Sequence, residues 1–252
     1  MPTVIILAGG RGTRLKEVTQ DKMPKPMVPV PYQGVNYPFI SFLLHRLRNQ
    51  GIRQVVICVD HQAEQFVSYF GNGEHYGIEI LYDEAGHVKT GSRVRHAMNK
   101  VKGSEVIIHC GDVYHPLNMR RFLDGFAEHP DDKMQIAVQG QLDGMDILPN
   151  IEIDKNQRIV GYKTPGSEKT RLVLGTCVLA VRREVMSYLP QSMDFSLTKD
   201  LYPILIARNL VGAYQSKAAF HEVGNPDGYL RFCQYVENDG IQPLLQQEVQ
   251  CV

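Results

Sequence analysis

The sequence predicts an α/β fold, a doubly wound, mostly parallel Rossmann-like sheet that continues into a β-rich second half. Two patterns support the first part. Short apolar runs typical of buried strands recur at residues 4–7, 55–59, 78–81 and 106–108. Between these runs, apolar side chains recur at helical spacing, over residues 63–70, 94–101 and 119–126. Strands that alternate with helices in this way form parallel sheets with helices on both faces.

The pattern changes after about residue 132. Strand-like runs then follow one another with few helices between them, at residues 136–138, 151–153, 159–162 and 172–181. No Gly/Ser-rich linker separates the two parts, so we expect residues 1–252 to form a single domain with halves 1–131 and 132–252. No hexapeptide repeat follows Asn238, and no C-terminal β-helix is therefore expected.

Composition excludes several classes of partner. The 27 basic and 27 acidic residues balance, so no bulk attraction to nucleic acid or to a membrane surface is expected. Neither a signal peptide nor a transmembrane segment is recognisable. The five cysteines are widely spaced and form no Cys-x-x-Cys pair, which favours reduced thiols in a cytoplasmic protein: Cys58, Cys110, Cys177, Cys233 and Cys251.

A glycine-rich segment directly follows the first apolar run. Residues 9–12 contain three glycines, whose backbone N–H groups can approach an anion closely. Arg14 adds a cation, and Lys25 adds a second one within Pro24-Lys25-Pro26-Met27. Backbone donors beside cations at the end of a strand predict a cradle for a polyphosphate. The residues assigned to it are Leu7, Ala8, Gly9, Gly10, Gly12, Thr13 and Arg14.

Other glycine motifs fit this segment less well. A P-loop ends in Gly-Lys-Ser/Thr, whereas this chain has Gly12-Thr13-Arg14. A dinucleotide-binding turn needs a glycine where Leu15 stands and an acidic residue about 20 positions later. An ordinary tight turn is the remaining alternative. The additional presence of Lys25 and of Gly111-Asp112 argues against a simple turn.

These motifs resemble the signature of the sugar-1-phosphate nucleotidyltransferases, also called nucleotide-sugar pyrophosphorylases. The resemblance is carried by residues 7–15, Leu-Ala-Gly-Gly-Arg-Gly-Thr-Arg-Leu, and by Pro-Lys-Pro-Met at residues 24–27. Weaker similarity continues at Thr90-Gly91-Ser92-Arg93, His109-Cys110-Gly111-Asp112 and residues 222–227. It implies transfer of a nucleoside monophosphate from a nucleoside triphosphate to a phosphorylated small-molecule acceptor.

The resemblance also implies roles for individual residues. Arg14 and the glycine amides would hold the β- and γ-phosphates, and Lys25 would neutralise the α-phosphate. These two cations are therefore the predicted catalytic residues, because alignment and charge neutralisation dominate such transfers. Residues 1–131 would bind the nucleotide and residues 132–252 the acceptor. Members of the family are often dimers or tetramers, which implies a homo-oligomer.

Asp112 and Glu222 are the predicted metal ligands. Asp112 ends an apolar run, where a carboxylate is costly unless it is paired or bound to a metal. The alternative is an N-cap for the helix that contains Met119. The nearby phosphate loop favours a Mg²⁺ ligand, with Mn²⁺ as a substitute. Glu222 stands where relatives usually have the second ligand, an aspartate; a solvated carboxylate is the alternative there.

The base and the acceptor are predicted from weaker signals. Thr90, Gly91, Ser92 and Arg93 resemble the Thr-Gly-Gly-Arg of glucose-1-phosphate cytidylyltransferases, which favours CTP. The short chain without a C-terminal domain also resembles heptose-1-phosphate guanylyltransferases, so GTP and dTTP remain alternatives to CTP. Because ligands of such sheets bind at the carboxyl ends of the strands, we expect these four residues, the glycine segment and Asp112 to face one crevice.

The acceptor motifs of the family are altered in this chain. The usual Glu-Lys-Pro appears as Lys163-Thr164-Pro165, and Asn-Ala-Gly is replaced within residues 174–177. We assign Lys163, Gly175 and Thr176 to the acceptor. The changes leave three readings open: a sugar 1-phosphate, a non-sugar phosphate, or a catalytically silent nucleotide-binding homologue.

Overall fold

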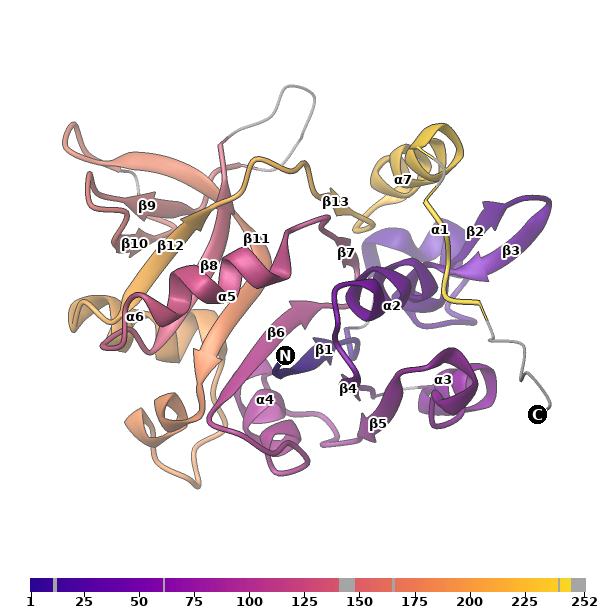
Figure 1. Cartoon of the computed structure of the whole chain (residues 1–252), viewed down its shortest axis with the longest axis horizontal. Coiled ribbons are helices and arrows are strands. Elements are labelled where there is room, and N and C mark those ends of the chain that lie inside the picture. Colours follow the sequence, from indigo (N-terminus) through magenta and orange to yellow (C-terminus); the bar gives the residue numbers. More distant parts are fainter. Residues whose placement is uncertain (11–12, 61, 141–147, 165, 240, 246–252) are drawn as a thin grey trace. The chain divides into compact units, whose positions relative to one another are not determined.

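The chain folds into two compact units in the computed structural model (Figure 1). Unit 1 comprises Met1–His87, Cys110–His115 and Phe220–Val252; unit 2 comprises Val88–His109 and Pro116–Ala219. The structure describes all residues except 11–12, 61, 141–147, 165, 240 and 246–252. The two units interleave along the chain. The fold is the expected mixed α/β fold with a mostly parallel central sheet.

Unit 1 contains three parallel strands. β1 (Thr3–Leu7), β4 (Gln54–Cys58) and β5 (Glu79–Asp83) lie in the order β1-β4-β5. β1 and β4 are almost entirely buried, as expected of parallel strands covered on both faces. The helices α2 (Phe39–Asn49) and α3 (Ala63–Phe70) follow β3 and β4 in the chain. The parallel arrangement predicted for this part of the sequence is confirmed.

A second part of unit 1 carries the short elements that surround the sequence motifs. β2 (Pro29–Tyr32) and β3 (Val35–Pro38) form an antiparallel hairpin, and β7 (Val113–Tyr114) pairs antiparallel with β13 (His221–Glu222). The helix α7 (Pro226–Asp239) contacts β13 and β2. One apolar cluster joins these elements: Leu15, Val28, Val30, Phe39, Phe42, Tyr114, Val223, Phe232 and Val236.

Unit 2 is rich in antiparallel strands. The long strand β11 (Arg171–Arg182) pairs antiparallel with β6 (Glu105–Cys110), β8 (Met134–Gln139) and β9 (Ile151–Ile153). β10 (Ile159–Tyr162) extends β9, and β12 (Val211–Gln215) runs parallel to β8. Its α-helices are α4 (Thr90–Met98), α5 (Met119–Ala127) and α6 (Tyr202–Ala207).

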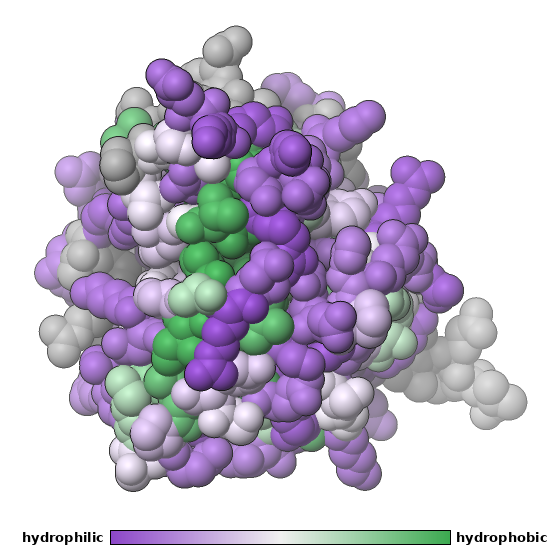
Figure 2. Space-filling view, turned by 90° about the vertical axis from the view of Figure 1, so that its left-hand side faces the viewer, coloured by the Kyte–Doolittle hydropathy of each residue, from purple (hydrophilic) through white to green (hydrophobic). Residues whose placement is uncertain are grey.

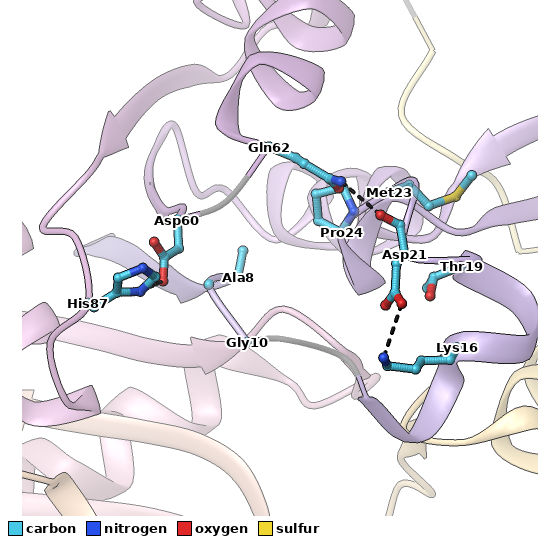
Figure 3. A pocket seen from close by; sticks show the side chains of 11 residues that line it. Ala8, Gly10, Lys16, Thr19, Asp21, Met23, Pro24, Asp60, Gln62 and His87 are labelled. Atoms are coloured by element: carbon cyan, nitrogen blue, oxygen red, sulfur yellow. Dashed lines mark hydrogen bonds and ion pairs between the residues drawn. The ribbon is translucent and has the colours of Figure 1, made fainter.

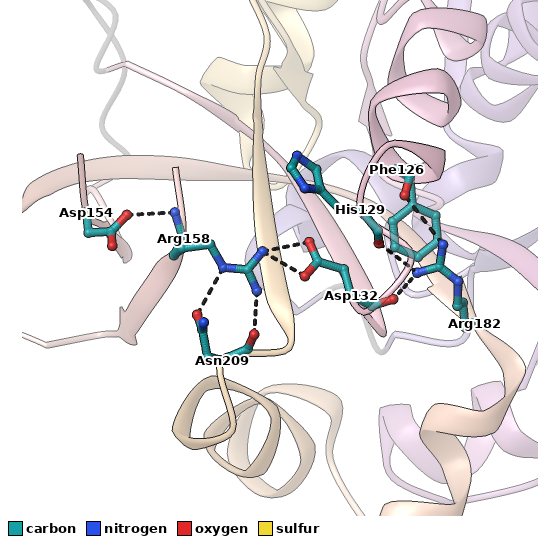
Figure 4. Close-up of polar contacts among 7 residues, drawn as sticks. All are labelled: Phe126, His129, Asp132, Asp154, Arg158, Arg182 and Asn209. Carbon is teal, nitrogen blue, oxygen red and sulfur yellow. Dashed lines mark hydrogen bonds and ion pairs between the residues drawn. The ribbon is translucent and has the colours of Figure 1, made fainter. Parts of the chain in front are cut away.

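A polar network at one end of unit 2 joins four of its segments (Figure 4). The side chain of Asp132 is 5% exposed and forms an ion pair with Arg158 at 2.7 Å. Arg158 also donates from Nε to Oδ1 of Asn209 at 3.0 Å and from Nη2 to the Asn209 carbonyl. Arg182 donates to the backbone carbonyl of Asp132 and lies over the Phe126 ring. This network fixes the turns that follow α5, β9 and α6.

The outer surface of unit 2 carries apolar side chains in a band (Figure 2). The large apolar side chains that are exposed in this unit include Val160 of β10 and Leu172 of β11, at 43% and 38%. No helix within the described residues is long and apolar enough to span a membrane.

Candidate active site

A cleft of about 690 Å³ opens in unit 1 beside the carboxyl ends of β1 and β4 (Figure 3). The backbone of Ala8 still pairs with β4, because its N–H donates to the Cys58 carbonyl at 2.9 Å. Gly9 and Gly10 then leave the sheet and line the cleft. A Cβ added to Gly10 would meet nothing within 4 Å. Packing against the described residues therefore does not require glycine at position 10, and the open space is compatible with close approach of a ligand.

Lys25 and Asp112 form the first ion pair of the site. The Lys25 Nζ donates to Oδ2 of Asp112 at 2.8 Å, and the side chains are 12% and 27% exposed. Lys25 begins a 3₁₀ turn whose backbone is closed by the Val28 N–H on the Lys25 carbonyl. The helix-cap alternative for Asp112 is wrong, because Asn118 caps α5 by accepting a hydrogen bond from the Arg121 N–H.

Arg14 and Glu222 form the second ion pair. Nη2 of Arg14 lies 3.3 Å from Oε1 of Glu222, and the side chains are 66% and 25% exposed. A Cβ on Gly224 would clash with Oε1 of Glu222 and come within 3.3 Å of Nη2 of Arg14. Glycine at position 224 thus leaves room for this pair. The single contact and the exposed arginine indicate a weak pair that solvent screens.

The two carboxylates lie on neighbouring backbone positions. Glu222 is the pairing partner of Val113, and the Val223 N–H donates to the Asp112 carbonyl at 2.8 Å. Two carboxylates near the glycine turn predicted to bind phosphates fit Mg²⁺, which takes one or two protein carboxylates together with substrate phosphates. No group of three or more His, Cys, Asp or Glu side chains suited to a metal gathers among the described residues. Asp112 and Glu222 are the residues that would hold the ion.

One apolar core positions all four charged residues. Leu15 follows Arg14 directly, Val28 lies three residues after Lys25, and Val223 follows Glu222; all three belong to the buried cluster of unit 1. Tyr114, two residues after Asp112, belongs to it as well. Motifs that lie up to 208 residues apart in sequence are therefore brought together by burial of their apolar neighbours.

Two other polar pairs line the cleft itself, where the four charged residues described above are not among the lining residues, and these pairs were not predicted from the sequence. Asp60 is 19% exposed and contacts Nδ1 of His87 at 3.2 Å. Lys16 contacts Asp21 at 3.0 Å, as Figure 3 shows on the opposite side of the cleft. A signal for Asp60 was present, because it follows the apolar run 55–59 as Asp112 follows 106–110.

The segment Thr90–Arg93 begins α4 in unit 2. The N–H groups of Gly91 and Ser92 donate to the Phe195 carbonyl at 2.9 and 3.1 Å, and the Ser92 Oγ accepts from the Phe195 N–H. A Cβ on Gly91 would clash with the Phe195 ring. The Ser92 hydroxyl also lowers the pKa of Asp194 by hydrogen bonding to its carboxylate. The segment thus anchors residues 194–197, and its contact with a base stays a prediction.

The three acceptor candidates occupy different environments. Lys163 is exposed, with φ at +55°, and its N–H donates to the Asn150 carbonyl at 2.8 Å. The Gly175 N–H donates to Oδ1 of the same asparagine at 3.0 Å. Thr176 is fully buried, and its hydroxyl donates to the Ala137 carbonyl. The structure therefore brings Lys163 and Gly175 together at Asn150, a residue that the sequence analysis missed, and turns the Thr176 hydroxyl into the core.

Glu152 holds the segment that follows Lys163. The carboxylate of Glu152 is almost buried and accepts from the Thr164 hydroxyl at 2.6 Å and from the Thr170 hydroxyl. These hydrogen bonds, with Thr164 the largest contributor, lower the pKa of Glu152. A Cβ on Gly161 would clash with Oγ1 of Thr164. Thr164 and Thr170 are thus held against a charged side chain of β9.

Comparison with known proteins gives the family. The parallel strands of unit 1, with a glycine turn at their carboxyl ends, place the chain among α/β proteins of the nucleotide-binding kind. The model of the nucleotidyl transferase family matches residues 3–148, more than half of the chain. The chain belongs to this family.

Similar proteins differ in the nucleotide that their names specify. A UTP–glucose-1-phosphate uridylyltransferase of Synechocystis is 27% identical over 220 residues, which cover 82% of this chain and 55% of that protein. A D-glycero-α-D-manno-heptose 1-phosphate guanylyltransferase of Aneurinibacillus thermoaerophilus is 28% identical over 231 residues, covering 89% and 94%. The crystal structure of HddC from Yersinia pseudotuberculosis superposes with a TM-score of 0.78 at 25% identity, covering 93% and 99%. The chain thus spans about half the length of the first relative and almost all of the other two.

Proposed function

We propose that this protein transfers a nucleoside monophosphate from a nucleoside triphosphate to a sugar 1-phosphate, giving a nucleoside-diphosphate sugar and pyrophosphate. The observation that carries the proposal is the pairing of Lys25 with Asp112 and of Arg14 with Glu222, with Asp112 held next to the glycine turn because the Gly111 N–H donates to the Leu7 carbonyl at 2.9 Å. Two cations and two carboxylates at such a turn provide both phosphate ligands and metal ligands. The names of the similar uridylyl- and guanylyltransferases support the same reaction.

The charged residues account for the chemistry without a protein nucleophile. An oxygen of the acceptor phosphate attacks the α-phosphorus, and pyrophosphate leaves in line. Lys25 exchanges Asp112 for an α-phosphate oxygen, and Arg14 exchanges Glu222 for the β- and γ-phosphates. Asp112 and Glu222 would then hold Mg²⁺, which would supply the charge neutralisation that two cations alone leave incomplete. Fixed charges that need little reorganisation stabilise the transition state.

The choice of nucleotide is part of the proposal. The segment Thr90–Arg93 favours CTP, with GTP and dTTP as alternatives, and the relatives named above use UTP and a guanine nucleotide. Thermal-shift titration with each nucleoside triphosphate in Mg²⁺ tests the choice. Stabilisation by GTP or dTTP with none by CTP would remove the cytidylyltransferase reading and leave the transferase proposal intact.

Pyrophosphate release tests the reaction itself. The purified protein is assayed with four nucleoside triphosphates and with glucose, mannose, heptose and inositol phosphates as acceptors. We expect turnover with at least one pair, loss of turnover in EDTA and recovery with Mg²⁺ or Mn²⁺. Turnover only with a non-sugar phosphate would select that alternative. Nucleotide binding without turnover in every combination would favour a silent homologue.

A further inference from the structure

We propose that Asn150 is a specificity-determining residue for the acceptor, and that its side-chain amide donates a hydrogen bond to an acceptor hydroxyl. The inference rests on the proposed function and deepens it. The Asn150 side chain, from a segment 25 residues away in the sequence, accepts a hydrogen bond from the backbone N–H of Gly175, one of the acceptor candidates.

The orientation of the Asn150 amide follows from its partner. The Gly175 backbone N–H is a donor, so the atom that faces it at 3.0 Å must be the amide oxygen Oδ1. The amide nitrogen Nδ2 then keeps both of its N–H donors, and none of the described residues accepts a hydrogen bond from it. Asn150 is only partly buried, so a ligand can reach this group.

The backbone of Asn150 is held on both sides. Its N–H donates to the Val173 carbonyl at 3.1 Å, and its carbonyl accepts from the Lys163 N–H at 2.8 Å. A residue held by two backbone hydrogen bonds and one at its side-chain amide is preorganised for recognition, because little freedom is lost when a ligand binds.

Gly175 provides the space for this amide. A Cβ at position 175 would lie 2.8 Å from Cδ1 of Ile151 and 3.4 Å from Oδ1 of Asn150. A side chain at 175 would therefore displace the end of the Ile151 side chain and bring its Cβ into contact with the amide of Asn150.

The neighbouring charge indicates the class of ligand. Lys163 is exposed, and its backbone is tied to Asn150. The Lys163 ammonium lies 5.7 Å from the centroid of the Tyr162 ring. An exposed cation on the residue hydrogen-bonded to Asn150, together with an amide that has free N–H groups, suits a polyhydroxylated phosphate monoester, with Lys163 attracting the phosphate and the Asn150 amide donating to a hydroxyl oxygen. Sugar 1-phosphates and inositol phosphates both have this chemistry, and the acceptor panel distinguishes them.

The test uses Asn150→Asp in the full chain. Aspartate keeps an oxygen for the Gly175 N–H and removes the N–H donors at nearly constant shape. We expect the KM or dissociation constant for the acceptor to rise about tenfold or more, with the KM of the nucleotide and the melting temperature unchanged. The matched control is Asn156→Asp, which adds the same charge at an exposed position of unit 2 and should leave the acceptor KM unchanged.

Analogues of the acceptor lacking single hydroxyls identify the contact. For one deoxy analogue, the penalty in wild type should vanish in Asn150→Asp, because both changes remove the same hydrogen bond. An unchanged acceptor KM in Asn150→Asp, with wild-type turnover intact, would overturn the inference and leave the proposed function standing. If the wild-type protein shows no turnover, calorimetric titration with the same acceptor phosphates measures their dissociation constants for wild type and Asn150→Asp. Failure of wild type to bind any of them would overturn both.

Discussion

The ion pairs of the candidate site and the ion pair at Asp132 are built differently. In unit 1, Lys25 and Asp112 share one contact of 2.8 Å, and Arg14 meets Glu222 through one contact of 3.3 Å. In unit 2, Arg158 places all three of its guanidinium nitrogens on protein acceptors around Asp132, which is 5% exposed (Figure 4).

The difference shows how a charge can be held for stability or kept available for binding. A guanidinium whose three nitrogens all have protein acceptors gains little from a new ligand. Removing it leaves a buried carboxylate without a cation. A cation with a single carboxylate partner can exchange that partner for a phosphate oxygen at small cost. The site pairs of unit 1 are of the second kind, which agrees with a role in phosphate and metal binding.

The largest expected effect is on stability, in Arg158→Ala. We expect a loss of about 3–5 kcal/mol in the free energy of unfolding, because Asp132 stays buried without its cation. Chemical denaturation of the purified protein measures it. Arg120→Ala is the control, since the Arg120–Asp124 pair on α5 is 79% and 57% exposed and should contribute about 0.5 kcal/mol or less. Equal losses of unfolding free energy in Arg158→Ala and Arg120→Ala would show that the buried network at Asp132 contributes no more stability than an exposed ion pair.

Lys25→Ala should act on turnover and leave stability almost unchanged. Loss of a preorganised donor at the transferring phosphate costs about 2.7–4 kcal/mol, a decrease of about 10²- to 10³-fold in kcat. Lys22→Ala, at an exposed position three residues earlier, should turn over at the wild-type rate. Near-normal kcat in a folded Lys25→Ala protein would show that this lysine is an ordinary surface cation.

Asp112→Asn separates two proposed roles of Asp112: binding Mg²⁺ and pairing with Lys25 before the nucleotide binds. The variant should fold and be almost inactive in Mg²⁺, because an amide is a poor substitute for a carboxylate ligand. In EDTA, however, it should bind a nucleoside triphosphate about fivefold more tightly than wild type, since Lys25 is no longer paired. Calorimetric titration with and without Mg²⁺ measures both effects. Unchanged metal-free affinity would mean that the Lys25–Asp112 pair does not oppose binding.

The smallest expected effect concerns Glu152 and pH. Hydrogen bonds from Thr164 and Thr170 hold the folded-state pKa of Glu152 below its ordinary value of 4.5. The resulting stabilisation is present above pH 4.5 and is lost as the pH falls through the folded-state pKa. Glu152→Gln should therefore lose less stability than wild type between about pH 7 and about pH 3.5. Parallel acid-induced losses in both proteins would speak against this role.

The sequence predicted the parallel strands well and the Pro-rich region poorly. β1 and β4 are continuous apolar runs, which is the pattern that a doubly covered strand requires. β2 was missed because Pro29 and Pro31 argue against a strand. A two-stranded hairpin tolerates them, because an edge strand needs fewer backbone donors. The turn at Gln33-Gly34, with φ of +50° and +81°, supplies the tight connection.

The surroundings of the acceptor candidates could not be predicted from the sequence pattern. Thr176 was chosen from the family motif, but β11 shifts its register between Gly175 and Leu179, and Cys177 takes φ of +59° there. A bulge of this kind breaks the alternation by which side chains are assigned to faces. Asn150 carried no signal of its own, because its role depends on pairing with Gly175 across two strands. The two interleaved units could not be recognised in the sequence, because contacts between distant residues define them and composition does not.

The interleaving has a consequence for how the protein matures on the ribosome. Chains are made from the N-terminus at about 5–20 residues per second, and domains generally fold as units. Residues 1–87 and 110–115 emerge early, but unit 1 is completed only by Phe220–Val252. Until then the core of unit 1 lacks Val223, Phe232 and Val236, and Asp112 has no neighbouring Glu222. The nascent chain therefore carries an unfinished first unit throughout synthesis of the second, and the ion pair between Arg14 and Glu222 can form only afterwards.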